Sequence, residues 1–357
     1  MNGKRAGLIG AAIGTAGAVG VGAAVAARRY AVGRTRLRPD PDANEPFGGL
    51  RGQPLTVYAS DGVPLHVEVE GPDDAEVTLV FCHGYCLTQD SWHYQRRDLA
   101  QVADLRMVFW DQRSHGRSGR SDNDHTTIDQ CGDDLLAVLD ATTAPGRSVV
   151  LVGHSMGGMT IMALADLHPG LFGDRIAGVA LINTSSGGVA ELTLGLPVAF
   201  GKVLKVTLPG VIRGLGKRAE LIDRGRRIGA DVAFVATRRI AFADREVSPT
   251  VVDFLEQMIR STPIDVIADF YPTLAAHDKL AALDVLRELP ALVVVGGEDR
   301  LTPAAHGRAI AAALPEADLV EIADGGHVVM LEHPGLITDA LAGLVDRVRP
   351  IAEERTA

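Results

Sequence analysis

The sequence predicts an α/β protein whose doubly wound, mostly parallel sheet is interrupted by a helical insertion. Short apolar runs at residues 77–82, 148–152 and 291–295 are bounded by turn residues, as buried parallel strands are. Segments with helical patterning alternate with these runs. A chain of 357 residues with 46% hydrophobic content is also long and apolar enough to bury both faces of such a sheet.

The chain begins with an apolar stretch, residues 6–27, which has no charged residue and is flanked by basic residues. It is long enough to span a bilayer, and small residues recur at every fourth position, as they do in transmembrane helices that associate. Residues 1–34 therefore fit a membrane anchor that also mediates homo-oligomers, a cleaved signal peptide, or an unstructured tail. The arginines that follow favour an anchored protein with a cytoplasmic catalytic domain, whereas a signal peptide would mean secretion.

Composition and patterning divide the rest of the chain into five parts. These are a linker rich in Pro, Gly and Arg (35–52), the first part of the core (53–186), a helical cap (187–289), the second part of the core (290–350) and a tail (351–357). The core is expected to open with an edge hairpin, because residues 55–59 and 65–70 flank the turn Asp61-Gly62.

A serine occupies a sharp turn in the middle of the core. Residues 153–158 read Gly-His-Ser-Met-Gly-Gly, follow the apolar run 148–152 and precede a run of helix formers. Ser155 thus lies between a strand and a helix, which exposes its hydroxyl at the end of the sheet. Glycines flank it because such a turn is strained and its backbone packs closely. The pattern indicates a nucleophile rather than a small-residue turn that happens to contain serine.

Candidate partners for Ser155 follow two later strands. Asp299 comes just after the run 291–295, with Glu298 as its only close rival, and His327 comes after residues 319–322. Loops past the carboxyl ends of parallel strands are where α/β sheets bind ligands. Other polar residues near these motifs are expected to order loops: His83, His115, His154 and His333, and Asp111 with Arg113 as a turn-stabilising pair.

These segments resemble the α/β-hydrolase superfamily, and in particular its capped serine esterases and lipases. The resemblance covers about residues 53–350. It rests on His83-Gly84 as the oxyanion loop, residues 111–118 after the next strand, the turn at 153–157, Gly297-Glu298-Asp299, Gly326-His327 and Glu332-His333-Pro334. The chain order Ser, Asp, His is the order of that superfamily. The resemblance implies the α/β-hydrolase fold with a cap inserted over the site.

The resemblance also implies a mechanism. Ser155 would attack an acyl carbonyl while His327 accepts its proton, and Asp299 would orient the imidazole. The backbone N–H groups of Tyr85 and Met156 would form the oxyanion hole. No metal and no organic cofactor is expected, since Cys82, Cys86 and Cys131 lack the spacing of a zinc site or a redox motif.

The distribution of charge along the chain limits the classes of partner that it is expected to bind. The net charge of −10 argues against nucleic acid. Residues 201–245 nevertheless carry eleven Lys or Arg against four acidic residues, interleaved with apolar ones. This pattern is typical of a solvated helix face, and equally suits an anionic membrane surface.

The predicted activity is hydrolysis of carboxylic esters with an apolar acyl group, because the cap is rich in aliphatic residues. Three alternatives stay open: a thioesterase, a cofactor-free haloperoxidase with perhydrolase activity, and a non-catalytic ligand-binding relative. The haloperoxidases usually have Pro where this chain has Cys86. Epoxide hydrolases and dehalogenases would carry Asp in place of Ser155. Acyl chain length and leaving group are not encoded in these motifs.

Overall fold

The computed structural model describes residues 38–144, 146–188, 237–244 and 246–356. Among them is an eight-stranded sheet with the order β1-β2-β4-β3-β5-β6-β7-β8. The strands are β1 (Gln53–Tyr58), β2 (Pro64–Glu70), β3 (Val77–Cys82), β4 (Leu105–Trp110), β5 (Ser148–His154), β6 (Ile176–Ile182), β7 (Ala291–Gly296) and β8 (Asp318–Ile322). β1, β2 and β4 pair antiparallel, and all pairs from β4 to β8 are parallel. The predicted fold class and the edge hairpin are confirmed.

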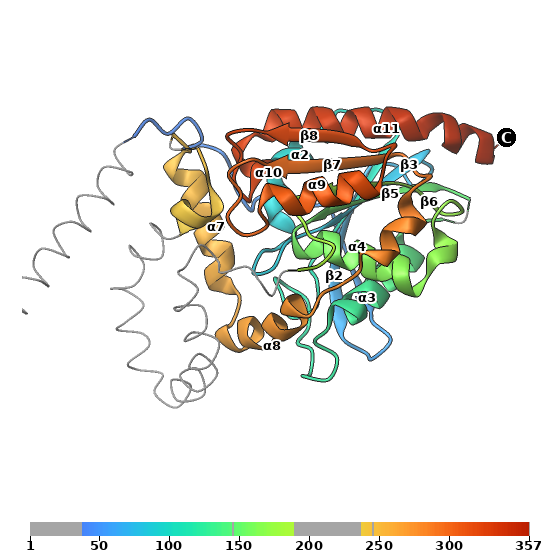
Figure 1. Ribbon diagram of the computed structural model, residues 1–357, viewed down its shortest axis with the longest axis horizontal. Helices are drawn as coiled ribbons and strands as arrows, with labels where there is room; N and C mark the ends of the chain where they lie inside the picture. The colour runs from blue at the N-terminus through green and yellow to red at the C-terminus, as the bar shows by residue number, and fades with distance from the viewer. Residues whose placement is uncertain (1–37, 145, 189–236, 245, 357) are drawn as a thin grey trace, which may run out of the picture.

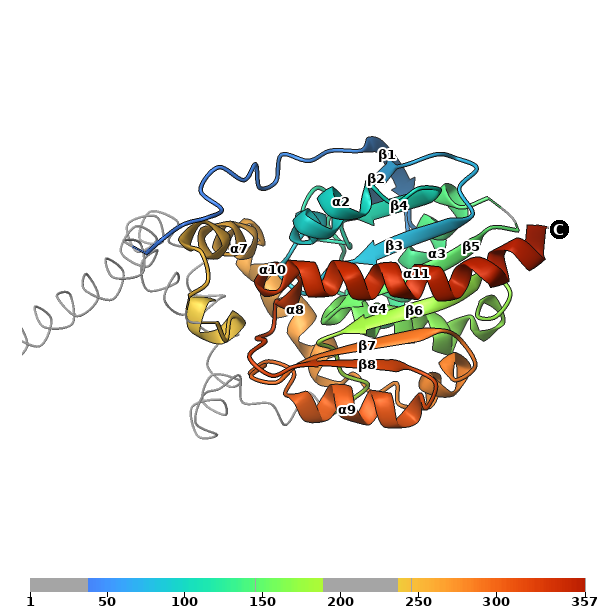
Figure 2. The ribbon, with the colours of Figure 1, turned by 90° about the horizontal axis from the view of Figure 1, so that it is seen from above.

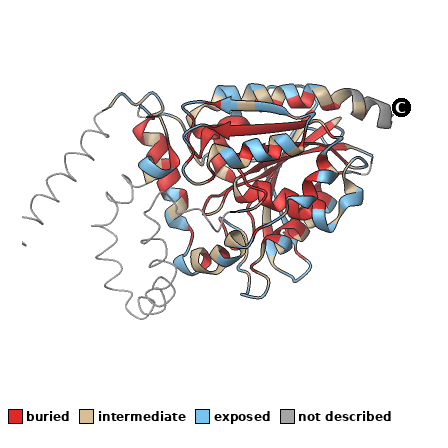
Figure 3. Ribbon diagram, in the orientation of Figure 1, coloured by how far each residue is buried: buried red, intermediate tan, exposed pale blue. Residues whose placement is uncertain are grey.

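Helices cover both faces of this sheet (Figures 1 and 2). On one face lie α2 (His93–Leu99) and α11 (Pro334–Thr356), and on the other lie α3 (Ile128–Thr142), α4 (Met156–Leu167) and α9 (Ala304–Ala313). Side chains alternate across a strand, so Val150 and Val152 of β5 join the first core while Val149 and Leu151 join the second. The central strands β3, β5, β6 and β7 are therefore buried on both faces (Figure 3).

The centre and the edges of the sheet differ in how far their residues are buried. Every residue of β3, β5, β6 and β7 is buried, which is why these strands are continuous apolar runs. β8 lies at the edge, and four of its five residues are at least partly exposed, Leu319 among them at 46%. Its sequence accordingly includes Asp318 and Glu321.

Two helices of the insertion between β6 and β7 lie beyond the carboxyl ends of the parallel strands (Figures 1 and 2). They are α7 (Pro249–Ser261) and α8 (Ile264–Ala275). Val266 and Phe270 of α8 pack against Met156 and Met159 of α4. The shorter helices are η1 (Gln89–Trp92), η2 (Pro169–Leu171), η4 (Ala281–Leu286) and α10 (Val329–Glu332).

Two expectations fall outside the described residues: the apolar segment 6–27, and the part of the basic stretch that precedes residue 237. Within the described ranges, no helix combines the length and the apolar character needed to cross a membrane.

Candidate active site

Ser155 occupies the turn between β5 and α4 with φ 52° and ψ −117°. Residues with side chains rarely adopt this conformation, and it persists where the surrounding structure holds it. The backbone N–H of Ser155 donates to the carbonyl oxygen of Ile182 (3.0 Å), and the hydroxyl of Thr184 donates to the carbonyl oxygen of Ser155 (2.7 Å). A Cβ on Gly157 would overlap the carbonyl oxygen of Cys82, so the turn packs directly on β3.

The structure brings Ser155, His327 and Asp299 together. The Nε2 atom of His327 lies 3.1 Å from the Oγ atom of Ser155, and its Nδ1 atom lies 2.8 Å from Oδ2 of Asp299. Both partners are buried, with Asp299 5% and His327 6% exposed. An ionised carboxylate only accepts, so Nδ1 carries the proton and Nε2 is left to accept the serine proton.

The surroundings of Asp299 favour its ionised form. Burial opposes ionisation, but the charge and hydrogen bond of His327 and the N–H groups of Thr302 and Leu301 outweigh it and hold the pKa of Asp299 below its ordinary value. Those N–H groups donate to Oδ1 at 3.0 and 2.7 Å. The rival Glu298 is exposed, and in the described part of the chain it makes no hydrogen bond to His327.

The two residues predicted to supply oxyanion-hole N–H groups are neighbours of Ser155, Met156 in the chain and Tyr85 in the lining of the cavity. Met156 is the first residue of α4, and Tyr85 lines the same cavity as Ser155. Gly84 lies against the turn so closely that a Cβ there would come within 3.3 Å of the Cβ of Ser155. Neither N–H has an acceptor among the residues that the structure describes. Free donors at the start of a helix can stabilise a developing negative charge.

Three other histidines, His83, His115 and His154, are neutral and order loops of the site. Burial lowers the pKa of His83 to about 4. Burial and a neighbouring histidine lower the pKa of His115 and of His154 to about 3. His83 contacts the carbonyl oxygen of Gly84, His115 that of Arg113, and His154 that of His327, at 2.8, 2.9 and 2.8 Å. His333 instead lies 3.7 Å from Asp324. The first three contacts match the loop-ordering roles expected from the sequence.

Asp111 and Arg113 have the expected loop-stabilising role, but no hydrogen bond joins them to each other among the described residues. Arg113 is fully buried, so its charge requires carboxylate partners. It donates two hydrogen bonds of 2.6 Å to Asp134 of α3 and one of 2.8 Å to Asp61. Asp111 instead accepts the backbone N–H groups of Gln89 and Arg117 (2.8 and 2.9 Å). Each side chain stabilises the loop through different partners.

A cavity of about 270 Å³ opens over Ser155. Its walls come from α4, α7, α8 and the loops around the three residues: Tyr85, Cys86, Leu87, His154, Ser155, Met159, Ala241, Leu255, Ile259, Leu274, Leu301, Thr302, His327 and Val328. The hydroxyl of Tyr85 donates to the carbonyl oxygen of Ile267, and that of Thr302 lies 2.8 Å from Asp299. With these hydroxyls engaged, the described walls facing Ser155 are mainly apolar.

Residues of the insertion also bond to the loop that carries His327. The backbone N–H of His327 donates to the carbonyl oxygen of Ala241 (2.8 Å). The carboxylate of Glu332 accepts the N–H of Ala243 (2.7 Å) and that of Gly326 (2.6 Å). The wall of the cavity and the imidazole are thereby held by one set of hydrogen bonds.

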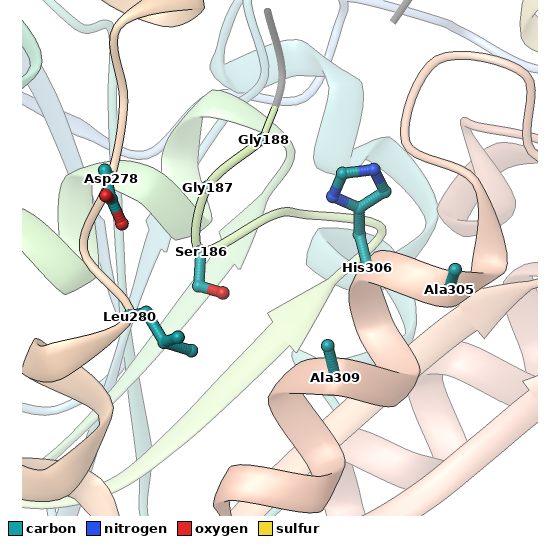
Figure 4. A pocket seen from close by; sticks show the side chains of 8 residues that line it. All are labelled: Ser186, Gly187, Gly188, Asp278, Leu280, Ala305, His306 and Ala309. Carbon is teal, nitrogen blue, oxygen red and sulfur yellow. The ribbon is translucent and has the colours of Figure 1, made fainter. Parts of the chain in front are cut away.

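A second hollow, of about 380 Å³, lies past the end of β6 and beside α9 (Figure 4). Figure 4 shows Asp278 and His306 on either side of Ser186. His306 is engaged at Nδ1 by the hydroxyl of Ser185 (2.7 Å). Ser155, His327 and Asp299 are absent from its described lining.

No group of three His, Cys, Asp or Glu side chains in the described ranges is placed to hold a metal ion. The cysteines Cys82, Cys86 and Cys131 are free and buried.

Comparison with known proteins shows the family to which this fold belongs. The model of the alpha/beta hydrolase family matches residues 79–340. The dihydrolipoyllysine-residue acetyltransferase component of the acetoin cleaving system of Pseudomonas putida is 28% identical over 71% of this chain, and the match spans only 59% of that relative. A thermophilic esterase from Thermogutta terrifontis has 24% identity and a TM-score of 0.62, over 84% of this chain and all of that one. An enol-lactonase from Burkholderia xenovorans has 25% identity and a TM-score of 0.64, over 82% and 100%.

Fold and matches together show a protein with the alpha/beta hydrolase fold. The chain belongs to the alpha/beta hydrolase family.

Proposed function

We propose that this hydrolase cleaves carboxylic esters with an apolar acyl group through an acyl-enzyme on Ser155. The observation that carries the proposal is the continuous contact from Ser155 through His327 to Asp299 at one wall of an apolar cavity. The similarity to an enol-lactonase supports the same bond class, since a lactone is an internal ester.

The first half of the reaction forms the acyl-enzyme. The Oγ atom of Ser155 attacks the ester carbonyl carbon as Nε2 of His327 takes its proton, and Asp299 stabilises the imidazolium. The N–H groups of Met156 and Tyr85 hold the oxyanion, a donor of this kind being worth about 2.7–4 kcal/mol of barrier. The bond to the leaving oxygen then breaks, and that oxygen receives the proton from His327 and departs as an alcohol.

The second half restores the enzyme. A water molecule gives a proton to His327 and attacks the acyl carbon, and the oxyanion forms again at the same two N–H groups. Collapse returns the proton to Ser155 and releases a carboxylic acid. Every proton passes through Nε2, the imidazole nitrogen that Asp299 leaves available.

The cavity supports an apolar acyl group. Leu255 and Ile259 of α7, Leu274 of α8 and Met159 of α4 face it. Burial of apolar substrate surface against such side chains contributes about 25 cal/mol per Å² to the gross binding free energy. Apart from His154 and His327, the described residues that line the cavity have no ionisable side chain that could pair with a carboxylate on the acyl group.

Labelling with a fluorophosphonate tests the proposal. The parent protein and the Ser155→Ala and His327→Ala variants are treated with the probe, and the adduct is located by peptide mass spectrometry. We expect a single adduct on Ser155, lost in Ser155→Ala and slowed by several orders of magnitude in His327→Ala. The control Ser186→Ala changes the second hollow and should label like the parent. Absence of an adduct in well-folded parent protein would refute the proposal.

The alternatives are separated by substrate. An oxoester and a thioester with identical acyl groups distinguish an esterase from a thioesterase, because only the leaving atom differs. Perhydrolase activity is measured as peracid formed from a carboxylic acid and hydrogen peroxide. Binding without turnover that survives Ser155→Ala would identify a non-catalytic relative.

A further inference from the structure

Asn183 directly follows β6. Its backbone conformation is unusual, and both polar atoms of its side-chain amide form hydrogen bonds. Its φ is 43°, in the left-handed region that Asn adopts more readily than other residues with side chains, and it is 3% exposed. Its Oδ1 atom accepts the backbone N–H of Gly296 (2.7 Å). Its Nδ2 atom donates to the carbonyl oxygens of Gly326 (2.7 Å) and His327 (2.9 Å).

These partners belong to the two loops that carry the acid and the base. Gly296 ends β7, three residues before Asp299. Gly326 and His327 lie beyond β8. The backbone carbonyl of Asn183 also accepts the hydroxyl of Thr302 (2.9 Å), an oxygen that lies 2.8 Å from Oδ2 of Asp299. One residue is thereby bonded to both loops, without touching the reacting atoms.

We propose that Asn183 is a positioning residue that sets the separation of Asp299 and His327, an inference that rests on the function proposed above. The acid and the base come from different strands, so their 2.8 Å contact depends on how the two loops are held relative to each other. The amide of Asn183 is a direct hydrogen-bonded link between these loops. Catalytic groups displaced by fractions of an ångström lose much of their rate.

The chemistry of the amide suggests two informative variants. Glycine accepts a left-handed φ without strain, so Asn183→Gly removes the amide while it preserves the turn. Aspartate retains an acceptor for the N–H of Gly296, but turns a carboxylate oxygen towards the carbonyl oxygens of Gly326 and His327. That arrangement is favourable only when the new carboxyl is protonated and can donate.

Steady-state kinetics with p-nitrophenyl butanoate tests the inference in the full chain. For Asn183→Gly we expect kcat to fall by about tenfold to a hundredfold with KM within about twofold of the parent, because substrate contacts are intact. For Asn183→Asp we expect the ratio of its kcat to the parental kcat to fall as the pH rises between about 6 and 9, the range in which buried carboxyls titrate. Asp299, His327 and His154 are the ionisable groups around the amide, and division by the parent at each pH corrects for pH effects that the two proteins share.

One control variant and two possible outcomes keep the inference falsifiable. Asn123→Gly, in an exposed loop, should behave like the parent. Parental kcat in Asn183→Gly would overturn the inference and assign the residue to the backbone turn alone. If Asn183→Gly fails to fold, a pH-independent ratio for Asn183→Asp overturns it instead.

A spectroscopic readout separates this inference from the proposed function. The proton between His327 and Asp299 is expected to give a downfield resonance in the proton NMR spectrum, lost in Asp299→Asn. Its loss or upfield shift in Asn183→Gly supports the positioning role even in a parent that hydrolyses no ester, and an unchanged resonance refutes that role. A parent without turnover or phosphonate adduct refutes the proposed function alone.

Discussion

Gln112 donates two hydrogen bonds to His83, one from its backbone N–H to Nε2 (2.9 Å) and one from its side-chain amide to the carbonyl oxygen (2.6 Å). Its side-chain oxygen accepts the hydroxyl of Thr160 (2.6 Å), which also lies 3.1 Å from the carbonyl oxygen of Met156. Buried polar groups thus connect the loop that contains Tyr85 with the first turn of α4. Gln112 thereby links the two segments whose N–H groups are proposed for the oxyanion hole.

Replacement of Gln112 by Met should therefore impair the oxyanion hole without a large change of volume. We expect kcat to fall by about tenfold to a hundredfold, below the 10²–10³ typical of complete loss of a donor. KM should change little, since the acyl cavity is intact. Thr160→Val breaks only one link and should have a smaller effect. Unchanged kcat in Gln112→Met would show that the loop keeps its place without this side chain.

Asp299→Asn should lower kcat by about 10⁴-fold, because an amide in its place favours the wrong imidazole tautomer. The matched control is Glu298→Gln, which alters the exposed neighbour and should retain activity within about twofold. Single-turnover kinetics with a chromogenic ester measures both. The reverse result, an active Asp299→Asn and a damaged Glu298→Gln, would move the role to Glu298.

Ile259 should limit the length of the acyl group. Ile259→Phe places a larger side chain in the cavity wall formed by α7, so we expect kcat/KM for a hexanoate ester to fall by about tenfold or more while that for an acetate ester is nearly unchanged. Ile264→Phe, at an exposed position on α8, is the control and should leave both values unchanged. A series of p-nitrophenyl esters of increasing acyl length provides the measurement. Equal losses for acetate and hexanoate would place the acyl group elsewhere.

Glu68 should make the fold sensitive to acid. Burial would raise its pKa, but the N–H of Gly52 and the guanidinium of Arg96 lower the pKa from 4.5 to about 2. A carboxyl with a depressed folded-state pKa stabilises the fold above its unfolded pKa, and that contribution is lost as the pH falls towards the folded value. Glu68→Gln should thus be less stable than the parent near neutral pH, and the difference should shrink between about pH 4.5 and 2. Urea unfolding across this range measures it, and a constant difference would contradict the assignment.

The parts of the fold that the sequence predicts best are those with a local cause. Residues 77–82 and 291–295 are apolar throughout because β3 and β7 are buried on both faces. Ser155 and Asp299 are recognisable because each follows such a strand within a short motif, and His327 because it follows the edge strand β8 within the run Gly-Gly-His. Asn183 carries no comparable signal, since its amide partners lie 113 to 144 residues further along the chain.

Arg113 is a second residue whose role could not be predicted in full from the sequence. It lies two residues from Asp111, and the two residues are expected from the sequence to stabilise the turn as a pair. Its carboxylate partners are Asp134 on α3, 21 residues away, and Asp61, 52 residues away, because the buried guanidinium bonds across elements as well as within its own loop. Periodicity predicts which residues are buried, but the choice among buried carboxylates depends on packing between elements.

The hydrogen bond from the N–H of His327 to Ala241 couples the position of His327 to that of the cavity wall. Ala241 belongs to the wall of the cavity, and Glu332 fastens the neighbouring Ala243 to the loop of the base. A substrate too bulky for the enclosure would push this wall outward and draw the imidazole away from Ser155. Such a molecule would occupy the enzyme without being turned over, so rejection of poor substrates would occur at the proton-transfer step as well as at entry.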